Sequence, residues 1–227
     1  MISLTSVSVT HRTAAGVVHS LNDVNLAVET GEYVAVLGAS GSGKTTLLNV
    51  IGGLIQPSAG DVEVAGKTIT SLSENDRANL RLRSIGVVFQ DNNLIAEFTA
   101  LENVILPLSA RGWHQSDAIA EAQRLLERFD IGPLANRKPF ELSGGQRQRV
   151  GIARGLAGGR NILLADEPTG SLDTANSRAV FTLLGEVAAQ GVAVVVATHD
   201  PNIERFASRV VSMRDGQIVA DTRAARA

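Results

Sequence analysis

The sequence predicts an α/β fold with a mainly parallel core sheet, and two patterns lead to this prediction. Short runs that are almost wholly apolar are typical of parallel strands covered on both faces. Four such runs are present, at residues 34–37, 85–89, 162–165 and 192–197. Between the last two runs, apolar residues recur at helical spacing, which indicates a strand–helix–strand unit with a right-handed crossover.

The chain begins with a different pattern, which predicts an N-terminal antiparallel β lobe. Around residues 2–9 and 24–28, apolar and polar side chains alternate, as they do in strands with one buried face. Near the other end, Asp215 and Gly216 form a turn between two short apolar runs, which predicts a hairpin. We expect the last five residues to fray.

Residues 91–157 are predicted to form an inserted α-helical subdomain. Thr99 and Glu102 have the spacing of a helix-capping box. One predicted helical face collects apolar side chains, namely Ile119, Ala122, Leu125, Leu126 and Phe129. No internal repeat or low-complexity linker separates this segment from the segments 1–90 and 158–227, so the 227 residues are expected to form a single domain.

The composition excludes several classes of function. Without cysteine, disulfides, thiolate zinc sites, iron–sulfur clusters and cysteine nucleophiles are ruled out. The net charge is -2 and no basic run is present, so no direct nucleic-acid partner is expected. The apolar runs are far shorter than the ~18 residues of a spanning helix, and no signal peptide is expected.

The clearest motif is the glycine-rich stretch GASGSGKTT at residues 38–46, which lies between a predicted strand and a predicted helix. Its glycines let backbone N–H groups turn toward phosphate oxygens, and the helix N-terminus favours an anion. Lys44 supplies a positive charge at the β- and γ-phosphates, and Thr45 a magnesium ligand. The fold class is therefore a P-loop NTPase, with a nucleotide site formed by Gly38, Ser40, Gly41, Ser42, Gly43, Lys44, Thr45 and Thr46.

Two acidic residues follow the predicted strand 162–165, at the edge where a parallel sheet delivers functional groups. Asp166 can hold Mg²⁺ directly or through water. Glu167 can reach the water that attacks the γ-phosphorus and act as its general base. An acidic pair alone can also be a helix cap or a solvated surface feature, but its combination with the phosphate loop favours the catalytic interpretation.

A second glycine-rich element, LSGGQ at residues 142–146, precedes a predicted helix. Ser143 and the backbone N–H groups of Gly144 and Gly145 would form an anion site at the helix N-terminus. Alternatively, Ser143 is simply the N-cap of that helix. The residues alone do not distinguish a phosphate-binding element from a helix cap.

The chain resembles the nucleotide-binding subunit of ATP-binding cassette (ABC) transporters over nearly its whole length. The resemblance rests on three elements in this order: the phosphate loop, the LSGGQ element and the strand that ends in Asp-Glu. The resemblance implies a RecA-like core over 1–90 and 158–227, and ATP and Mg²⁺ as ligands. It implies that Gln90 contacts Mg²⁺, that Asp173 lies at a dimer interface, and that His199 touches the γ-phosphate. Without the resemblance, Gln90 would be interpreted as the polar end of a strand, Asp173 as a helix cap and His199 as a structural histidine.

One position departs from the family pattern. The early strand of these proteins usually carries a tyrosine that stacks on adenine, and the aligned residue here is His11. An imidazole can stack with less area than a phenol ring. The resemblance therefore implies either adenine stacking by His11 or a base held by neighbouring apolar side chains.

The resemblance also implies a head-to-tail homodimer with two ATP sites. Lys44, Glu167 and His199 of one copy would perform hydrolysis, while Thr45, Gln90 and Asp166 hold Mg²⁺. The second copy would contribute Ser143, Gly144, Gly145, Gln146 and Asp173. Membrane permease subunits are the implied partners, because this chain has no predicted spanning segment, and the implied location is the cytoplasmic face of the inner membrane.

Three shorter stretches, at residues 18–24, 99–104 and 168–173, resemble the branch that includes lipoprotein-release and macrolide-export ATPases, the MacB/LolD-like group. Two other functions are weighed against transport. A non-transport ABC ATPase of DNA repair, chromosome organisation or translation is disfavoured by the absence of a coiled-coil insertion, a second cassette and basic patches. A small-molecule kinase is disfavoured because no acceptor pocket is evident.

Overall fold

The computed structural model describes residues 1–13 and 16–223. Its strands are β1 (Ile2–Thr13), β2 (Gly16–Val28), β3 (Tyr33–Leu37), β4 (Ala59–Val64), β5 (Lys67–Thr68), β6 (Ile85–Val88), β7 (Ile162–Asp166), β8 (Ala193–Thr198), β9 (Arg209–Arg214) and β10 (Gln217–Arg223). Its α-helices are α1 (Lys44–Ile51), α2 (Glu74–Ser84), α3 (Ala100–Ala110), α4 (Gln115–Arg128), α5 (Gly144–Leu156) and α6 (Thr174–Ala189).

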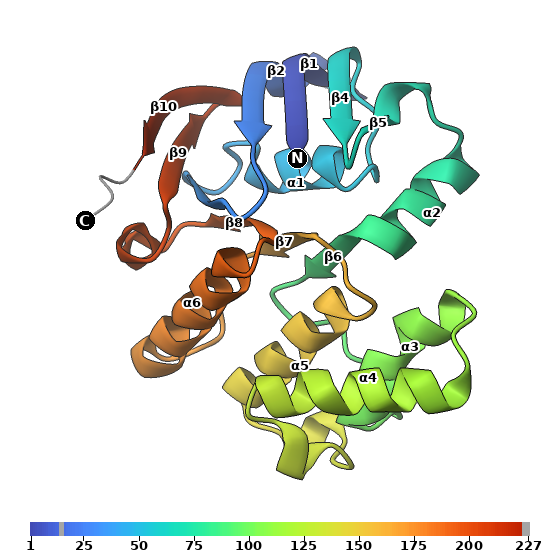
Figure 1. The fold of residues 1–227 in the computed structure, drawn as a ribbon. Coiled ribbons are helices and arrows are strands. Elements are labelled where there is room, and N and C mark those ends of the chain that lie inside the picture. Colours follow the sequence, from blue (N-terminus) through green and yellow to red (C-terminus); the bar gives the residue numbers. More distant parts are fainter. Residues whose placement is uncertain (14–15, 224–227) are drawn as a thin grey trace.

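The strands form two sheets, which confirms the predicted fold class. The larger sheet has the order β10-β9-β3-β8-β7-β6 and is parallel except for β10 at its edge. The smaller sheet, β2-β1-β4-β5, is wholly antiparallel. Figure 1 shows the smaller sheet at the top, with α1 beneath it. The predicted C-terminal hairpin is also present, and β9 joins it to the main sheet by pairing parallel to β3.

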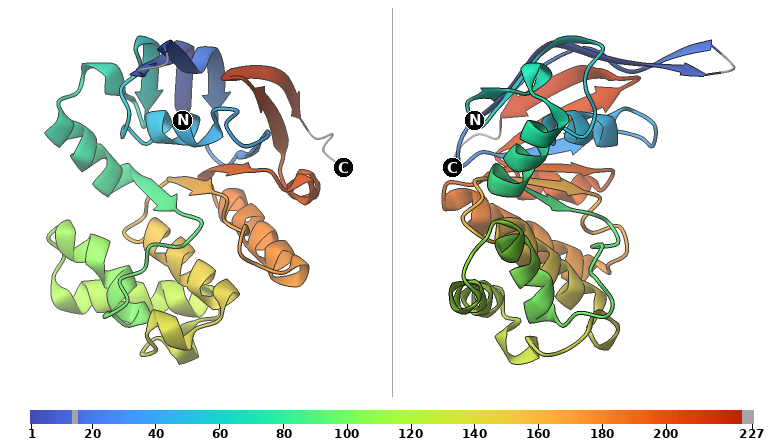
Figure 2. Two further views of the ribbon diagram at one scale, coloured as in Figure 1. Left: turned by 180° about the vertical axis from the view of Figure 1, so that it is seen from behind. Right: turned by 90° about the vertical axis from the view of Figure 1, so that its right-hand side faces the viewer.

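Two apolar cores hold these layers together, because side chains alternate along each strand of the main sheet. Val34 and Val36 of β3 pack with α1 and the antiparallel sheet. Tyr33 and Ala35 of the same strand face the opposite way, toward α6 and the helical lobe. The strands of the main sheet are therefore buried on both faces, and the side view in Figure 2 shows the layers in this order.

Helices α3, α4 and α5 form the predicted helical lobe (Figure 1). Thr99 accepts a hydrogen bond from the backbone N–H of Glu102, as a capping box requires. Of the apolar face predicted for α4, Ala122, Leu125, Leu126 and Phe129 are buried and Ile119 is half-buried. Within the described residues, no helix has the combination of length and hydrophobicity that crossing a bilayer requires.

Two features differ from the sequence-based expectations. The polar helix α2 is not predicted, because only Leu80 of its side chains is buried and no apolar stripe marks it. Its start does carry a local signal, since Ser73 accepts a hydrogen bond from the N–H of Asp76. At the C-terminus, Arg223 is still paired in β10, while residues 224–227, also expected to fray, lie outside the described residues.

The close approach of β6 to α5 generates a stability prediction. A Cβ atom at Gly86 would overlap the backbone of Gly155 in α5. We expect Gly86→Ala to lower the free energy of unfolding by at least ~2 kcal/mol, because helix and strand must separate to admit a methyl group. Urea denaturation measures this change.

The matched control is Gly185→Ala in α6, where an added Cβ would meet the ring of Tyr33 at an ordinary 3.8 Å. This change should raise the free energy of unfolding by about 0.5–1 kcal/mol, because alanine favours helix more than glycine does. Equal effects of the two substitutions would contradict the close packing of β6 on α5.

Candidate active site

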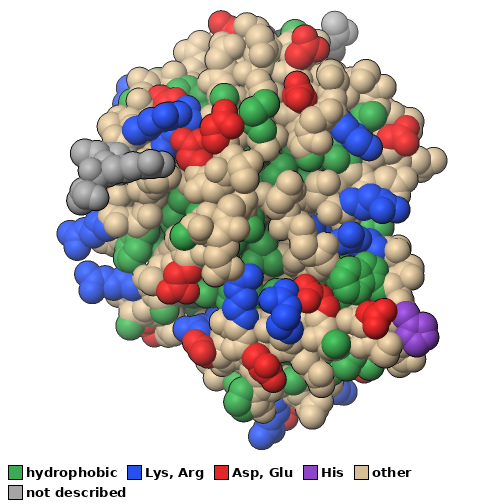
Figure 3. Space-filling view, viewed as in Figure 1, with side chains coloured by type: hydrophobic (Ala, Val, Ile, Leu, Met, Phe, Trp, Pro, Cys, Tyr) green, Lys and Arg blue, Asp and Glu red, His purple; other side chains and the backbone are tan. Residues whose placement is uncertain are grey.

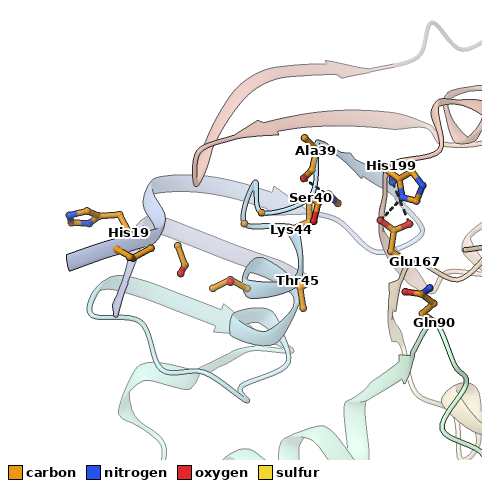
Figure 4. Close-up of a pocket in the computed structure, with 13 residues that line it drawn as sticks. His19, Ala39, Ser40, Lys44, Thr45, Gln90, Glu167 and His199 are labelled. Atoms are coloured by element: carbon orange, nitrogen blue, oxygen red, sulfur yellow. Dashed lines mark hydrogen bonds and ion pairs between the residues drawn. The ribbon is translucent and has the colours of Figure 1, made fainter. Parts of the chain in front are cut away.

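Three neighbouring strands of the main sheet deliver their C-terminal ends to one place. The middle strand, β8, pairs with β3 on one side and β7 on the other. Thr198 at the end of β8 is level with Leu37, which precedes the phosphate loop, and Ala197 is level with Asp166. The loops that follow these three strands therefore meet at one edge of the sheet, as Figure 4 shows.

The phosphate loop has the backbone that its glycines predict. Gly43 is the N-cap of α1 with φ 101°, in the left-handed region that glycine accepts readily. A Cβ there would also lie 2.5 Å from the carbonyl oxygen of Ser20. Lys44 is buried, and its Nζ donates to the carbonyl oxygens of Gly38 at 2.8 Å and Ala39 at 3.1 Å. In this arrangement, the ammonium group is held inside the loop.

Asp166 is placed to contribute to an Mg²⁺ site. Its Oδ1 atom is buried and has no hydrogen-bond partner. Burial raises the pKa of its carboxyl, while a hydrogen bond with Thr45 and the charge of Lys44 oppose this effect. A buried carboxylate oxygen without a partner, close to a threonine hydroxyl, fits the oxygen ligands that Mg²⁺ prefers.

Within the described part of the chain, no three acidic or histidine side chains form a group that could bind a metal unaided. The fit is therefore to a magnesium ion bound through one carboxylate together with substrate phosphates, which is the common arrangement for this metal.

Glu167 is held by the C-terminal end of β8 and the residue that follows it. Its backbone has φ 47°, which is unusual for a residue other than glycine, and its N–H donates to the carbonyl of Ala197 at 2.8 Å. Its Oε2 accepts from the hydroxyl of Thr198 at 2.9 Å. Its Oε1 lies 2.9 Å from Nδ1 of His199. The two residues expected to perform hydrolysis, Glu167 and His199, are therefore in direct contact.

These groups border one cleft of about 790 Å³ (Figure 4). Of the residues predicted for the site, it is lined by Ser40, Gly41, Gly43, Lys44, Thr45, Thr46, Gln90, Glu167 and His199. Gly38 and Ser42 lie on the other side of the loop. The Oγ of Ser42 is buried without a hydrogen-bond partner. The structure thus brings most of the predicted nucleotide-binding residues together.

His11 is not among the residues that line this cleft. It lies in β1 opposite Val18 of β2, and Val18 and His19 line the cleft instead. Figure 4 places His19 at the end of the cleft away from Glu167 and His199. Sequence reasoning did not assign His19 to the site, because its position depends on how β2 pairs with β1 and passes the phosphate loop.

The LSGGQ element at residues 142–146 does not line the cleft. Ser143 is the N-cap of α5, and its capping box with Gln146 is complete. Asp173 likewise caps α6 by accepting from the N–H of Asn176. A Cβ at Gly144 would lie 2.9 Å from the side chain of Leu172, so the two elements adjoin each other. Within one chain, the helix-cap interpretation of these residues holds, and neither element reaches the phosphate loop.

The segment after Gln90 is fastened to α5, which the sequence analysis missed. Asn92 and Asn93 both have positive φ values, of 59° and 44°. Their carbonyl oxygens accept hydrogen bonds of 2.5 and 2.7 Å from the guanidinium of Arg154 in α5. Consecutive asparagines are a signal for left-handed backbone. The segment that follows Gln90 is therefore hydrogen-bonded to the helix whose N-cap is Ser143.

Comparison with known proteins agrees with this geometry. A family model described as "ABC transporter" matches residues 21–170, which is more than half of the chain. The fold and the phosphate-binding edge already define a P-loop nucleotide-binding domain. The match makes the assignment specific: the chain belongs to the ABC transporter family and is one of its ATP-binding cassettes.

Individual relatives are similar over nearly the whole chain. The chain is 44% identical over 219 residues to the lipoprotein-releasing system ATP-binding protein LolD 2 of Caulobacter vibrioides, covering 96% of each. It is 42% identical over 205 residues to the macrolide export ATP-binding/permease protein MacB of Aggregatibacter actinomycetemcomitans, but spans only 32% of that protein's length. A dimeric, post-hydrolysis structure of the ATP-binding cassette MJ0796 bound to ADP and Pi matches with TM-score 0.90 and 38% identity, over 100% of both chains.

The buried carboxylate of Asp166 leads to a second prediction. Because burial raises its pKa in the folded protein above the unfolded value, ionisation costs stability once the pH exceeds the unfolded value. We expect nucleotide-free Asp166→Asn to melt ~2–4 °C above wild type at neutral pH. The difference should shrink as the pH falls toward ~4. Thermal denaturation across this pH range measures it.

Asp173→Asn is the matched control. A backbone hydrogen bond from Asn176 holds the pKa of Asp173 below its usual range, so its ionised form is favoured in the folded protein. This variant should melt no higher than wild type. If Asp166→Asn instead melts below wild type at neutral pH, the prediction is wrong, because neighbouring groups then compensate the charge of Asp166 in the nucleotide-free protein.

Proposed function

We propose that this chain is the ATP-hydrolysing subunit of an ABC transporter. One observation supports the proposal above others: the phosphate loop and the Glu167–His199 pair lie at the ends of adjacent strands around one cleft, and Asp166 directly precedes Glu167 at the end of β7. This arrangement is suited to transfer of a phosphoryl group to water. The family match and the ATP-binding names of the relatives agree with it.

Nucleotide binding follows from the loop and the helix behind it. The backbone N–H groups from Ser40 to Thr45 and the N-terminus of α1 surround the phosphates, and Lys44 exchanges carbonyl partners for phosphate oxygens. Thr45, Asp166 and Gln90 are the residues that would hold Mg²⁺. The ion neutralises charge on the β- and γ-phosphates when bound.

Hydrolysis requires a base beside the γ-phosphate. Glu167 lines the cleft. Its Oε2 accepts from the hydroxyl of Thr198 and the N–H of His199, while its Oε1, which contacts only Nδ1 of His199 among the described residues, retains a lone pair. Its carboxylate accepts the proton of the attacking water, and His199 is close enough to contact the γ-phosphate from the same side.

The second half of the site comes from a second copy. Ser143, the N-cap of the thirteen-residue helix α5, and Asp173 are exposed and do not line the cleft of their own chain. In a head-to-tail dimer, Ser143, Gly144, Gly145, Gln146 and Asp173 close over the partner's ATP. The dimeric form of the MJ0796 cassette supports this arrangement. Closure on ATP is then the step that performs work.

A groove on the helical lobe is the proposed docking site of the permease. It has a volume of about 500 Å³ and lies between β6, α2 and α3, next to the segment that follows Gln90. Figure 3 shows Lys, Arg and hydrophobic side chains side by side at this edge, between α2 and the helical lobe. Phe89 and Leu106 are exposed hydrophobic residues in it. A permease segment bound in this groove would contact Arg154, whose guanidinium holds the segment that follows Gln90.

The named relatives indicate the branch. LolD 2, of nearly the same length as this chain, is named as the ATP-binding protein of a releasing system, and MacB as a combined ATP-binding and permease protein. We propose a MacB/LolD-like subunit that acts through a separate permease, at the cytoplasmic face of the inner membrane.

The third prediction tests the activity. With Mg²⁺ and ATP, we expect hydrolysis whose rate per molecule rises with protein concentration, since two copies form the sites. Glu167→Gln should lower kcat by ~10²–10⁴-fold by removing the base. Phosphate release without an added acceptor measures this. If Glu167→Gln hydrolyses ATP at the wild-type rate, Glu167 is not the base. If ADP forms only when an acceptor molecule is added, the protein is a kinase.

The fourth prediction tests the composite site. Glu167→Gln with Mg²⁺ and ATP should elute as a dimer in size-exclusion chromatography with light scattering, and adding Ser143→Arg should keep it monomeric. Gln123→Arg is the control, because it places the same charge on an exposed position of α4. Dimer formation that survives Ser143→Arg would contradict the proposed interface.

A further inference from the structure

A buried hydroxyl group lies where an otherwise apolar strand ends. Thr198 is the last residue of β8, follows Ala-Val-Val-Val-Ala, and is 0% exposed. A buried hydroxyl costs free energy unless its hydrogen bonds are made. Its presence at this position therefore calls for partners within the protein, and β-branching restricts the rotamers from which it can reach them.

The hydroxyl of Thr198 makes a bond in each direction. It donates to Oε2 of Glu167 at 2.9 Å and accepts from the backbone N–H of Asp200 at 3.1 Å. Asp200 in turn caps the turn Pro201–Arg205 by accepting from the N–H of Asn202 at 2.9 Å. The carboxylate of Glu167 is thus linked through one hydroxyl to the hydrogen-bonded turn that Asp200 caps.

The other residue that binds this carboxylate, His199, contacts it twice: its backbone N–H donates to Oε2 at 3.4 Å, and its imidazole lies against Oε1. The side chain of His199, bonded to Oε1, is 70% exposed, whereas that of Glu167 is 19% exposed. The positive φ of Glu167 fixes where its side chain starts, but its remaining torsions are set by the groups that bind its oxygens. Of the two side chains that bind it, that of Thr198 is the buried one, and its bond of 2.9 Å is shorter than the 3.4 Å bond from the N–H of His199.

We propose that Thr198 is a positioning residue for ATP hydrolysis, which orients the carboxylate of Glu167 toward the attacking water. The inference rests on the proposed function. Thr198 does not line the nucleotide cleft but a neighbouring pocket of about 330 Å³, so it acts on the reaction through Glu167. Its loss should therefore lower kcat and leave KM unchanged.

Two substitutions at this position separate the hydroxyl from the shape of the side chain. Thr198→Val keeps the volume and the β-branch but removes the donor. Thr198→Ser keeps the hydroxyl and removes a buried methyl group. We expect Thr198→Val to lower kcat by ~10–100-fold with KM for ATP within about twofold of wild type, because a misdirected base loses rate and not nucleotide binding. Thr198→Ser should retain most of the wild-type kcat.

Stability measurements on the same proteins exclude a merely structural role. Both variants should unfold more easily, Thr198→Val because the N–H of Asp200 loses its acceptor and Thr198→Ser because of the lost methyl group. Equal loss of kcat in both, or turnover of Thr198→Val at or above the wild-type rate, would overturn the proposal. In the Glu167→Gln background, Thr198→Val should lower kcat no further.

Crystal structures of the nucleotide-free variants give a result that does not depend on turnover. The carboxylate of Glu167 should keep its position in Thr198→Ser and turn away in Thr198→Val, and an unchanged carboxylate in Thr198→Val would overturn the proposal. If wild type hydrolyses ATP and Glu167→Gln does not, the proposed function stands whatever Thr198→Val shows. If wild type lacks ATPase activity, the proposed function fails, while the structures still decide whether Thr198 orients Glu167.

Discussion

The parallel pairing of β8 between β3 and β7 is the constraint on which the site depends. These strands are far apart in sequence, yet their ends are level: Thr198 is paired with Leu37, and Ala197 with Asp166. A shift of one residue in either ladder would turn every side chain of the shifted strand to the other face and displace the phosphate loop relative to the acids. Apolar burial on both faces of the sheet fixes this register.

Polar groups at this edge are left incompletely paired in the free protein, and the apolar cores offset their cost. Among the described residues, the Oδ1 of Asp166 and the Oγ of Ser42 are buried without partners, and the ammonium of Lys44 donates to two loop carbonyls. Each is a group that phosphate or a bound cation can satisfy. The same atoms therefore lower the stability of the free cassette, and in the proposed site they would provide affinity for nucleotide.

Helix α5 connects the parts of the molecule that communicate. Its N-terminus carries Ser143, its Gly155 packs against β6, and its Arg154 holds the carbonyls that follow Gln90. Arg154 also lines the groove proposed for the permease. One helix thus contacts the segment after Gln90 and the groove proposed for the permease, and begins at the residue proposed for the dimer interface.

What the sequence by itself determined was local: a glycine-rich loop that needs left-handed backbone at Gly43, an N-cap at Ser143, and strands whose apolar runs require burial on both faces. These follow from conformational preference and short-range hydrogen bonds. Tertiary structure alone decided that Thr198 touches Glu167 and that Val18 and His19 line the cleft, because strand order and register bring together residues with no fixed spacing. Adenine stacking by His11 stays a prediction. Helix α2 was not predicted because it buries almost no apolar side chain.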